Sequence, residues 1–597
     1  MYKDLKNNSC LKYFCLKYKY KAMRNTKLIV LPILSLLTLS SCFFSNVKIT
    51  SKTKEVEVCS LFDGKAELNE TVSYQIFDNN DLLPYLSLSD YVSMYNKYKK
   101  DGYYFYVSET VYSSTFAVYQ PNDEAIFMAQ INTYQKQATM NGDFSSAFTV
   151  EKDYSKTSIS LRASTQYEIS KDPTAMRTMP YADAGYLVYR KNRINYFPLS
   201  LLEAVFASPS GIYHLFNYQR ILQYSEYEQL TNVTYQIDNQ EVNAFGEMKQ
   251  YIDKNMPVMP MYLRKDRKSS FLFTMDNLYG LKYTRNIKST KDYLEKQDFF
   301  TDFLSENTSK RNEAYYKTFA LLDDGHTSIR DHVSFPWIDG EFNQYGPKLT
   351  KMLEVRQTLS GARAESLTPG SVYYSTDGKL AFFTFDSFTF ADEAFLEDGK
   401  TPKEDLSDYN SVNYDTFFYF VKMLNQIKEK GGVEDVIIDI STNGGGVVGI
   451  MNKVITILAK ENTSDMYMQL DLTGMVQKMT TKVDSNGDDK FDNDDVYGND
   501  FNFHILTSEF SFSCGNAYPF LLKKNGIASI IGIKSGGGEC AVSESYLPSG
   551  EHYYHSGNIH LGWYADNAFE GDEAGAPVDV QIGYDDFFNL DKLQTLI

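Results

Sequence analysis

From about residue 372 to the end, the chain alternates short apolar runs with amphipathic segments. The apolar runs are nearly continuous, which is typical of strands buried on both faces of a parallel sheet. The segments between them carry apolar residues at the three- and four-residue spacing of a helix. This alternation predicts an α/β core with largely parallel strands over residues 372–597. In chain order the segments are "LAFFTFDSF", "YDTFFYFVKMLNQIKEK", "VEDVIIDIS", "GIMNKVITILAK", "FNFHILTS", "NAYPFLLKK" and "ASIIGIKS".

The first half of the chain has a different pattern. Between residues 48 and 232, short aromatic and β-branched runs such as "GYYFYVSETVYSSTFAVY" alternate with polar turns, which predicts a β-rich domain over residues 43–235. No group of titratable residues there suggests chemistry, so we interpret this domain as a spacer or recognition module. Apolar residues then recur at helical spacing between residues 289 and 322, which predicts a helical unit over residues 236–330. The whole chain is expected to be a multidomain α+β protein.

The helical unit ends in "LLDDGHTSIR", where Gly325 breaks the helix and leaves His326 on a loop. Residues 331–371 are then expected to connect this loop to the α/β core.

The pattern of the first residues predicts a secretion signal. Arg24 and Lys27 precede "LIVLPILSLLTLSSC", an apolar run that ends in small residues and is too short to span a bilayer permanently. Its last residues resemble a bacterial lipobox, which implies that residues 1–42 form a lipoprotein signal peptide and that Cys42 is lipidated. The protein is then expected on the extracytoplasmic face of the cell membrane. An uncleaved anchor and a buried helix are the alternatives, and Met23 is an alternative start.

Charge and cysteine content narrow the function classes. Residues 43–597 carry 51 basic and 76 acidic side chains, a net charge of −25, which argues against a nucleic-acid partner. Only Cys42, Cys59, Cys514 and Cys540 remain after processing, too few for a disulfide scaffold. A chain of 597 residues exceeds one hydrophobic core, so about three or four folding units are expected.

Glycine-rich turns follow several of the predicted core strands. In "IIDISTNGGGVVG", Asn443 and three glycines stand between a strand and a helix, where backbone N–H groups can approach an anionic oxygen. A phosphate-binding loop is disfavoured because valines, and no lysine, follow the glycines. "LTSEFSFSCGNAYPF" repeats the strand, turn and helix and places Ser511, Ser513 and Cys514 in the turn.

Five motifs in this order resemble the tail-specific (C-terminal processing) serine peptidase family, and most closely its tricorn core-like branch. The motifs are "LDDGHT", "VIIDISTNGGG", "SFSCGNAYPFLLKKNG", "IIGIKSGGG" and "DEAGAPVDVQI". The resemblance implies a core like the crotonase/ClpP-like spiral of βαβ units. The connector 331–371 is too short for the PDZ domain that many relatives carry there.

The resemblance also implies roles for individual residues. Ser513 takes the place of the nucleophile, and the backbone N–H groups of Gly445 and Cys514 take that of the oxyanion hole. Gly538 stands where the processing peptidases place a lysine base, and Lys534 comes four residues too early, so a Ser–Lys dyad is disfavoured. His326 then takes the place of the general base, with an ordinary pKa suited to neutral pH.

The acid that supports the histidine is less well defined. Glu573 is the best match to the family glutamate, with Asp572 and Glu570 as alternatives. The tricorn pattern has a serine where this chain has Gly325, so Thr327 or Asp324 is the alternative group to orient the imidazole.

Cys514 is the alternative nucleophile, because a thiol at a helix N-terminus has a lowered pKa. In the family fold Cys540 lies beside the nucleophile, which implies a Cys514–Cys540 disulfide as an alternative state of that thiol.

Two further motifs suggest metals, and no cofactor is required for the expected reaction. "DSNGDDKFDNDD" follows calcium-loop spacing and predicts a structural calcium site, with a solvated acidic hairpin as the alternative. Its expected ligands are Asp484, Asn486, Asp488, Lys490 through its carbonyl, and Asp495. His552, His555 and His560 lie in "EHYYHSGNIH", whose spacing fits no common helical zinc motif, so we expect them on a hairpin.

The sequence therefore predicts an exported serine endopeptidase that hydrolyses protein or peptide substrates. The β-rich domain is the candidate for substrate capture. The alternative is a catalytically relict lipoprotein that uses the same fold to bind a ligand or to act as a scaffold. The sequence leaves the oligomeric state open.

Overall fold

The computed structural model describes residues 50–597 apart from 143, 150–156, 172–175, 238–239, 257, 332–341, 393–394, 398–400, 412 and 472. The predicted signal peptide and Cys42 lie outside the described residues. Among the described residues, no helix is both long and apolar enough to cross a membrane.

Two sheets build the N-terminal region, as the alternating pattern predicts. In β1, inward residues from Val56 onward are buried while most of the first half of the strand is exposed. Most neighbouring strands are antiparallel, and β1 and β13 are parallel. The first sheet has the order β10 (Tyr189–Lys191), β11 (Ile194–Pro198), β3 (Tyr85–Ser87), β2 (Glu67–Phe77), β1 (Ser51–Ser60), β13 (Ile221–Tyr224) and β12 (Tyr213–Phe216). The second has the order β4 (Tyr104–Glu109), β5 (Ser113–Tyr119), β6 (Ala125–Asn132), β7 (Gln137–Gly142) and β9 (Arg177–Pro180).

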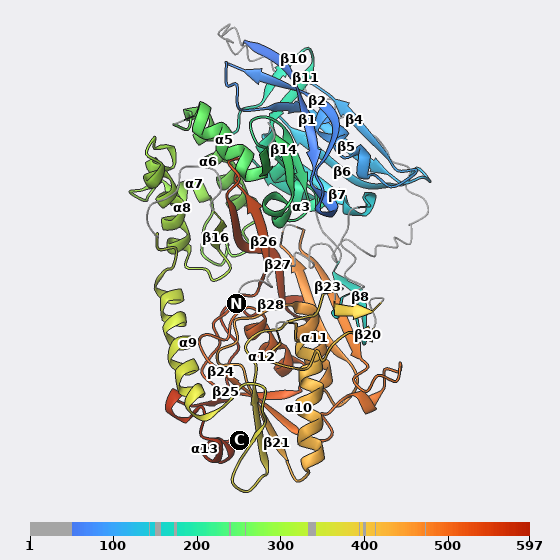
Figure 1. Cartoon of the computed structure of the whole chain (residues 1–597), viewed down its shortest axis with the longest axis vertical. Coiled ribbons are helices and arrows are strands. Elements are labelled where there is room, and N and C mark those ends of the chain that lie inside the picture. Colours follow the sequence, from blue (N-terminus) through green and yellow to red (C-terminus); the bar gives the residue numbers. More distant parts are fainter. Residues whose placement is uncertain are drawn as a thin grey trace.

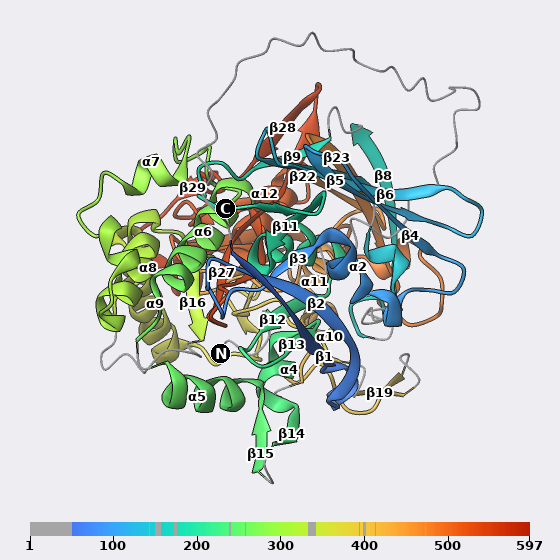
Figure 2. The ribbon, with the colours of Figure 1, turned by 90° about the horizontal axis from the view of Figure 1, so that it is seen from above.

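Helices accompany and follow these sheets. The helices α6 to α9 gather on one side of the molecule, opposite β4 and β6 (Figure 2). Helix α8 begins at an Asn307 cap and ends at Asp323, whose φ of 48° is left-handed, so that the following loop turns sharply. The elements are α2 (Leu88–Ser93), α3 (Leu199–Ser210), α4 (Tyr227–Asn232), the hairpin β14 (Thr234–Ile237) and β15 (Gln240–Asn243), α5 (Ala244–Asn255), α6 (Met261–Asn277), α7 (Thr290–Leu294) and α8 (Thr308–Leu322).

The C-terminal half contains the predicted α/β core. Its strands are parallel from β18 to β29, and only β17 is antiparallel. Alternate residues of each strand face opposite layers: Phe383 packs towards α10, α11 and α12, whereas Phe382 packs towards α9 and α13. The sheet has the order β17 (Tyr373–Tyr374), β18 (Leu380–Thr384), β21 (Asp435–Asp439), β24 (Asn502–Thr507), β25 (Ala528–Gly532) and β29 (Val580–Gln581). The helices are α9 (Pro347–Ser366), α10 (Thr416–Lys430), α11 (Val448–Ile457), α12 (Cys514–Lys524) and α13 (Leu590–Gln594).

A further sheet connects the two halves of the molecule. Its central strand β27 rises with β26 from the core towards the N-terminal sheets (Figure 1). Strand β16, which follows the His326 loop, pairs with β27. The strands are β16 (Ser328–Asp331), β27 (His552–Ala565), β22 (Ser464–Leu470), β23 (Met475–Val483) and β8 (Ala163–Lys171), with β26 (Cys540–Tyr546) and β28 (Ala568–Gly571) also paired to β27. A short hairpin joins β19 (Leu396–Glu397) to β20 (Thr401–Pro402).

Strand pairing crosses the expected domain boundaries at β16, which pairs with β27, and again at β8. Strand β8 comes from the region predicted as the N-terminal domain, yet it pairs along its length with β23 of the C-terminal half. Just before it, the Ser158 hydroxyl donates to Asp415 at 2.5 Å, and the buried Lys453 ammonium donates to the Ser158 carbonyl at 3.0 Å. The segment from about 157 to 171 therefore packs as part of the core.

Candidate active site

Ser513 stands at a strained turn between β24 and α12. Its backbone has φ 58° and ψ −126°, a region that residues with a side chain rarely occupy. Such strain persists only where the surroundings hold it, and it is common at functional sites. The turn places a half-buried serine hydroxyl at the N-terminus of a helix.

Four contacts hold this turn in place. The Ser511 hydroxyl donates to the Ile440 carbonyl at 2.8 Å, and the Phe512 N–H donates to the Asn443 carbonyl at 3.1 Å. The Ser513 N–H donates to the Gly537 carbonyl at 3.0 Å, and the Ser508 hydroxyl donates to the Ser441 carbonyl. Ser508 and Ser511 thus serve as buried braces between strands, which leaves Ser513 as the serine with an available hydroxyl.

The glycine turn after β21 lies against Ser513. A Cβ on Gly445 would lie 2.7 Å from the Ser513 Cβ and 3.0 Å from its Oγ, and Gly445 has φ 106°. Both facts require glycine here. The Gly445 N–H donates to Oδ1 of Asn443 at 2.8 Å, so this predicted oxyanion donor already has an acceptor in the present arrangement.

Cys514 begins α12, and its backbone N–H lies in the first turn, where helix N–H groups lack intrahelical partners. Its side chain is buried, with Sγ 3.2 Å from the Gly446 carbonyl. Cys514 and Cys540 are both free thiols, so the alternative disulfide is not formed. A thiol that faces the Gly446 carbonyl is poorly placed to act as the nucleophile.

His326 lies on the loop between α8 and β16, and its ring contacts the residue before Ser513. The ring centroids of His326 and Phe512 are 4.8 Å apart. His326 is buried, and neither ring nitrogen has a hydrogen-bond partner among the residues that the structure describes. Burial lowers the pKa of His326, Lys348 lowers it further, and Asp324 opposes both. The ring is therefore neutral at pH 7, as a general base must be.

Phe512 also explains a departure from the tricorn pattern. A Cβ on Gly325 would lie 2.6 Å from the Phe512 ring, and one on Gly538 would also lie 2.6 Å from it. The ring is thus clamped between two glycines, and a serine at position 325 would collide with it.

Asp324 and Thr327 hold the histidine loop by its backbone. The Asp324 carboxylate accepts the His326 N–H at 3.1 Å and the Thr327 hydroxyl at 2.6 Å. Neither residue bonds to the imidazole ring, so both fix the loop and leave the ring nitrogens open.

Glu573 lies on a loop that contacts the third glycine-rich turn. Its Oε2 accepts the N–H of Gly538 at 2.9 Å and that of Glu539 at 3.3 Å. Burial raises the pKa of Glu573, as does the nearby Asp324, whereas Lys348 lowers it. The expected acid therefore interacts electrostatically with Asp324 of the histidine loop, although it makes no hydrogen bond to His326.

The two alternative acids lie in different surroundings. Glu570 forms an ion pair with Lys524, and its side chain is more than half exposed, so it faces away from the site. Asp572 is 2% exposed, and neither carboxylate oxygen has a hydrogen-bond partner among the described residues.

The structure thus brings Ser513, His326 and Glu573 into one region without a hydrogen bond between any two of them. Three residues that the sequence did not indicate join them there. Arg285 interacts electrostatically with Asp324 and Glu573, and Tyr279 interacts with the same two carboxylates. Lys348, at the start of α9, has its Nζ 3.5 Å from the Cβ position of Gly537. They come from segments without a recognisable motif, so only the fold reveals them.

A buried arginine supports the glycine turn from behind. Arg363 of α9 makes two bonds to Asp386, at 2.9 and 2.8 Å, and donates to the hydroxyls of Thr384 and Thr442 at 2.7 Å. Because Thr442 precedes Asn443, this network fixes the turn that lies against Ser513. The segment expected to be a connector, residues 331–371, thus contains helix α9, which supports this turn.

In the predicted calcium loop, the carboxylates of Asp484 and Asp495 accept hydrogen bonds from backbone N–H groups of the same loop. Asp484 accepts three backbone N–H groups, and Asp495 accepts three more together with the Asn462 side chain. The Lys490 ammonium lies 2.6 Å from Asp488 and supplies a positive charge within the loop. These hydrogen bonds hold the loop in its present shape, and calcium binding stays a prediction.

The three histidines of "EHYYHSGNIH" lie on β27, as expected for a hairpin with β26. His555 donates through Nδ1 to the Ser556 carbonyl and contacts the Ser545 hydroxyl through Nε2, both at 3.0 Å. His552 stacks on Tyr227 and Tyr546.

Residues 407–557 match the model of peptidase family S41. No curated protein sequence is significantly similar to the chain. Solved structures show weak similarity. A lipoprotein from Streptococcus agalactiae is 12% identical over 57% of this chain and 98% of its own, with a TM-score of 0.33. The photosystem II D1 C-terminal processing protease is 17% identical over 37% of this chain and 46% of its own, with a TM-score of 0.23. The tricorn protease is 10% identical over 85% of this chain and 44% of its own, with a TM-score of 0.30.

Proposed function

We propose that the chain is an exported serine endopeptidase of the tail-specific peptidase family S41, in which Ser513 is the nucleophile and His326 the general base. The match of residues 407–557 to the model of that family supports the proposal. The chain is thus a serine-type peptidase, a hydrolase whose substrates are proteins or peptides. The proposal for the individual residues depends on one observation, the backbone conformation of Ser513.

That conformation suits a nucleophile. A serine on a strained strand-to-helix turn exposes its hydroxyl, and the next backbone N–H points to where negative charge develops. Here the next N–H is that of Cys514 at the start of α12. In the proposed reaction the Ser513 hydroxyl attacks the peptide carbonyl, and the N–H groups of Cys514 and Gly445 stabilise the resulting oxyanion. Gly445 takes part once its N–H is shared with or released from Asn443.

His326 would take the Ser513 proton and pass it to the leaving amine. Its burial and lowered pKa keep it neutral and ready to accept a proton. Its ring nitrogens have no hydrogen-bond partner among the described residues and its ring packs on Phe512, so the hydrogen bond to Ser513 would form as substrate binds. Such bonds are often loose before substrate binds.

Glu573 and Asp324 would stabilise the imidazolium that forms. Asp324 interacts electrostatically with both His326 and Glu573, so a positive charge on the ring would offset the repulsion between the two carboxylates. We assign the supporting role to Glu573, as the family pattern suggests, and a positioning role to Asp324.

The remaining features are consistent with a tethered extracytoplasmic enzyme. We propose that Cys42 carries the lipid anchor and that residues 43–235 capture substrate. We also propose that the parallel sheet with its two helical layers is a crotonase/ClpP-like core.

A fluorophosphonate probe tests the proposal. The full chain should be labelled, Ser513→Ala should abolish labelling and peptide hydrolysis, and Cys514→Ser should keep both. If the folded wild-type chain takes no label and cleaves no peptide, the binding or scaffold function is the correct one. Labelling that survives Ser513→Ala would assign the nucleophile elsewhere.

A further inference from the structure

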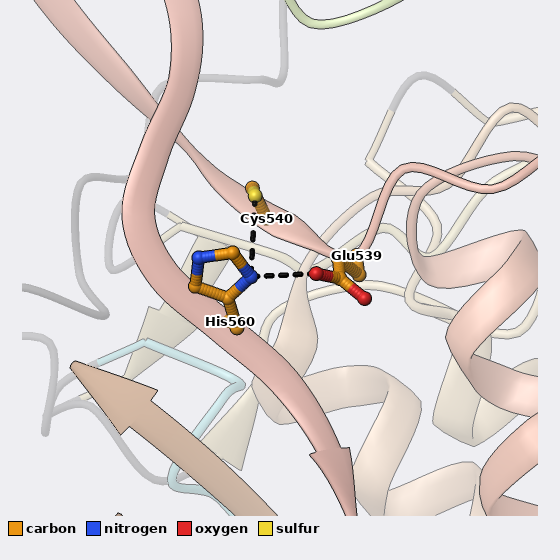
Figure 3. A group of neighbouring side chains, drawn as sticks. All are labelled: Glu539, Cys540 and His560. Atoms are coloured by element: carbon orange, nitrogen blue, oxygen red, sulfur yellow. Dashed lines mark hydrogen bonds and ion pairs between the residues drawn. The ribbon is translucent and has the colours of Figure 1, made fainter. Parts of the chain in front are cut away.

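A buried group of three side chains lies beside the proposed active site and is not used by it. Glu539, Cys540 and His560 converge from β26, the residue before it and β27 (Figure 3). Nδ1 of His560 lies 2.6 Å from Oε1 of Glu539 and 3.7 Å from Sγ of Cys540. All three residues are buried, and their ligand atoms lie within 4.8 Å of one another.

The strand register creates this group. Cys540 and His560 are direct partners in the β26–β27 ladder, so their side chains lie on the same face of the sheet. The backbone of the segment after α6 covers them, since a Cβ on Gly280 would lie 2.9 Å from Sγ of Cys540. The group is therefore a closed interior site.

The surroundings carry excess negative charge. Glu539 accepts the Glu573 N–H at 2.9 Å, and a Cβ on Gly571 would touch the same carboxylate. Asp572, between these two residues, is buried with both oxygens unpartnered among the described residues. A buried carboxylate without a partner calls for a cation or an ordered water. Two buried carboxyl groups, those of Glu539 and Asp572, thus lie near the imidazole, and burial together with Glu539 raises the pKa of Asp572 well above its ordinary value.

We propose that Glu539, Cys540 and His560 bind a zinc-class divalent metal ion, with Asp572 or water in the fourth position. Thiolate, imidazole and carboxylate are the ligands that zinc takes, whereas calcium and magnesium take oxygen alone. Tetrahedral zinc separates sulfur and nitrogen ligands by about 3.5 Å and nitrogen and oxygen ligands by about 3.3 Å, from the usual bond lengths. The Cys540–His560 separation of 3.7 Å is close to the first value, and Glu539 has to withdraw by about 0.7 Å from His560 to reach the second.

Supporting contacts outside the ligands are also in place. Nε2 of His560 lies 3.2 Å from Oδ2 of Asp471, an ion-pair distance without an aligned hydrogen bond, and a small rotation of the ring would give the carboxylate–histidine arrangement that orients metal ligands. Oε2 of Glu539 is held by the Glu573 N–H, which leaves Oε1 directed to the site. Two of the three ligands thus have fixed orientations without the metal.

The competing explanation is that His560 is an imidazolium that bridges Glu539 and Asp471. That arrangement satisfies the same distances but gives Cys540 and Asp572 no role. The two explanations differ in an observable: only the metal site yields a bond from the Cys540 sulfur to a metal.

The site would brace the active site and take no part in its chemistry. Glu539 follows Gly538, and the N–H groups of both hold the Glu573 carboxylate. The proposal does not depend on hydrolysis, because metal binding is measured directly.

Cobalt(II) titration of the chelator-treated full chain tests the proposal. We expect one equivalent to bind with a sulfur-to-cobalt charge-transfer band in the near ultraviolet, and one equivalent of zinc to bleach that band. Cys540→Ser should abolish the band, and Cys59→Ser, which changes the other buried thiol remote from the active site, should retain it. Absence of saturable cobalt binding, or a band that survives Cys540→Ser, would overturn the metal site in favour of the imidazolium bridge.

Asp471→Asn provides a variant that does not alter the ligands, at a side chain that is 29% exposed. It should weaken cobalt binding by about 10- to 100-fold while the band keeps its position. An unchanged affinity would contradict the orienting role of Asp471 and with it the proposed geometry. This test stands even if Cys540→Ser fails to fold.

Discussion

Phe512 packs against His326 with ring centroids 4.8 Å apart and ring planes at 57°. The residue directly before the proposed nucleophile thus sets the position of the proposed base. The Phe512 ring also lies between Gly325 and Gly538. It therefore cannot shift without moving the histidine loop, the Gly538 turn or its own serine turn.

We therefore predict that Phe512→Leu lowers kcat by roughly 10- to 100-fold, because a misplaced base costs this much, while KM changes by less than about threefold. Steady-state kinetics on a peptide substrate measure both values. Phe510→Leu is the control, since Phe510 packs on Arg356 of α9 and does not contact His326. Equal losses in the two variants would indicate a general packing defect.

Gly445→Ala should reduce hydrolysis by about 100-fold or more, an effect of the size seen when an oxyanion donor is lost. The added methyl group would meet the Ser513 Oγ at 3.0 Å, and the φ of 106° disfavours any side chain. Gly361→Ala is the matched control, because Gly361 lies in α9 with open space around its Cβ position. That control should keep full activity and gain about 0.5–1 kcal/mol of stability.

Arg363→Met should destabilise the fold by about 3–5 kcal/mol, since it leaves the buried Asp439 and the partly exposed Asp386 without their cation. Lys351→Met on the same helix removes an exposed pair with Glu509 and should cost less than about 1 kcal/mol. Urea unfolding of the two variants compares them. Similar midpoints would mean that the buried network contributes little.

The acid limb of the kcat/KM profile should have its midpoint below 6.5, because burial and Lys348 lower the pKa of His326. Only the neutral imidazole accepts the proton, so activity rises as pH rises through this pKa. Lys348→Gln removes a positive charge that disfavours the protonated ring, and the midpoint should therefore move to higher pH. Lys351→Gln, one turn further along α9, should leave it unchanged.

Acid should destabilise the fold partly through His555. Burial lowers the pKa of His555 to about 4, so between this value and 6.5 the unfolded chain binds a proton that the folded chain does not. Stability is complete above pH 6.5 and falls as pH drops towards 4. In His555→Gln the loss between pH 7 and pH 5 should be smaller by about 2 kcal/mol. Urea midpoints at pH 7 and pH 5 measure it, and an unchanged difference would contradict a neutral His555.

The sequence predicted the elements of the core well because their patterns are local. Strands β21 and β24 and the helix after Ser513 all lie where the apolar runs place them. The family motifs indicated His326, Ser513 and Glu573, and the structure gathers them in one region. Their mutual hydrogen bonds depend on side-chain orientations that no motif encodes.

Other features depend on which segments pair across long distances, and local pattern carries no signal for them. The pairing of β8 with β23 joins regions about 300 residues apart. The Cys540–His560 pair depends on the exact ladder register of β26 and β27, which a bulge shifts just after Cys540. Arg363 reads in sequence as an ordinary polar position in a helix, and only its burial among Asp386, Thr384 and Thr442 reveals its role.

Strand β27 pairs with β16, which follows His326, and with β26, which carries Cys540. A slip of β27 by one residue would turn its alternate side chains to the opposite face of the sheet. The histidine loop and the Glu539–Cys540–His560 group are therefore mechanically linked through this one strand, so that a change at either place can be felt at the other.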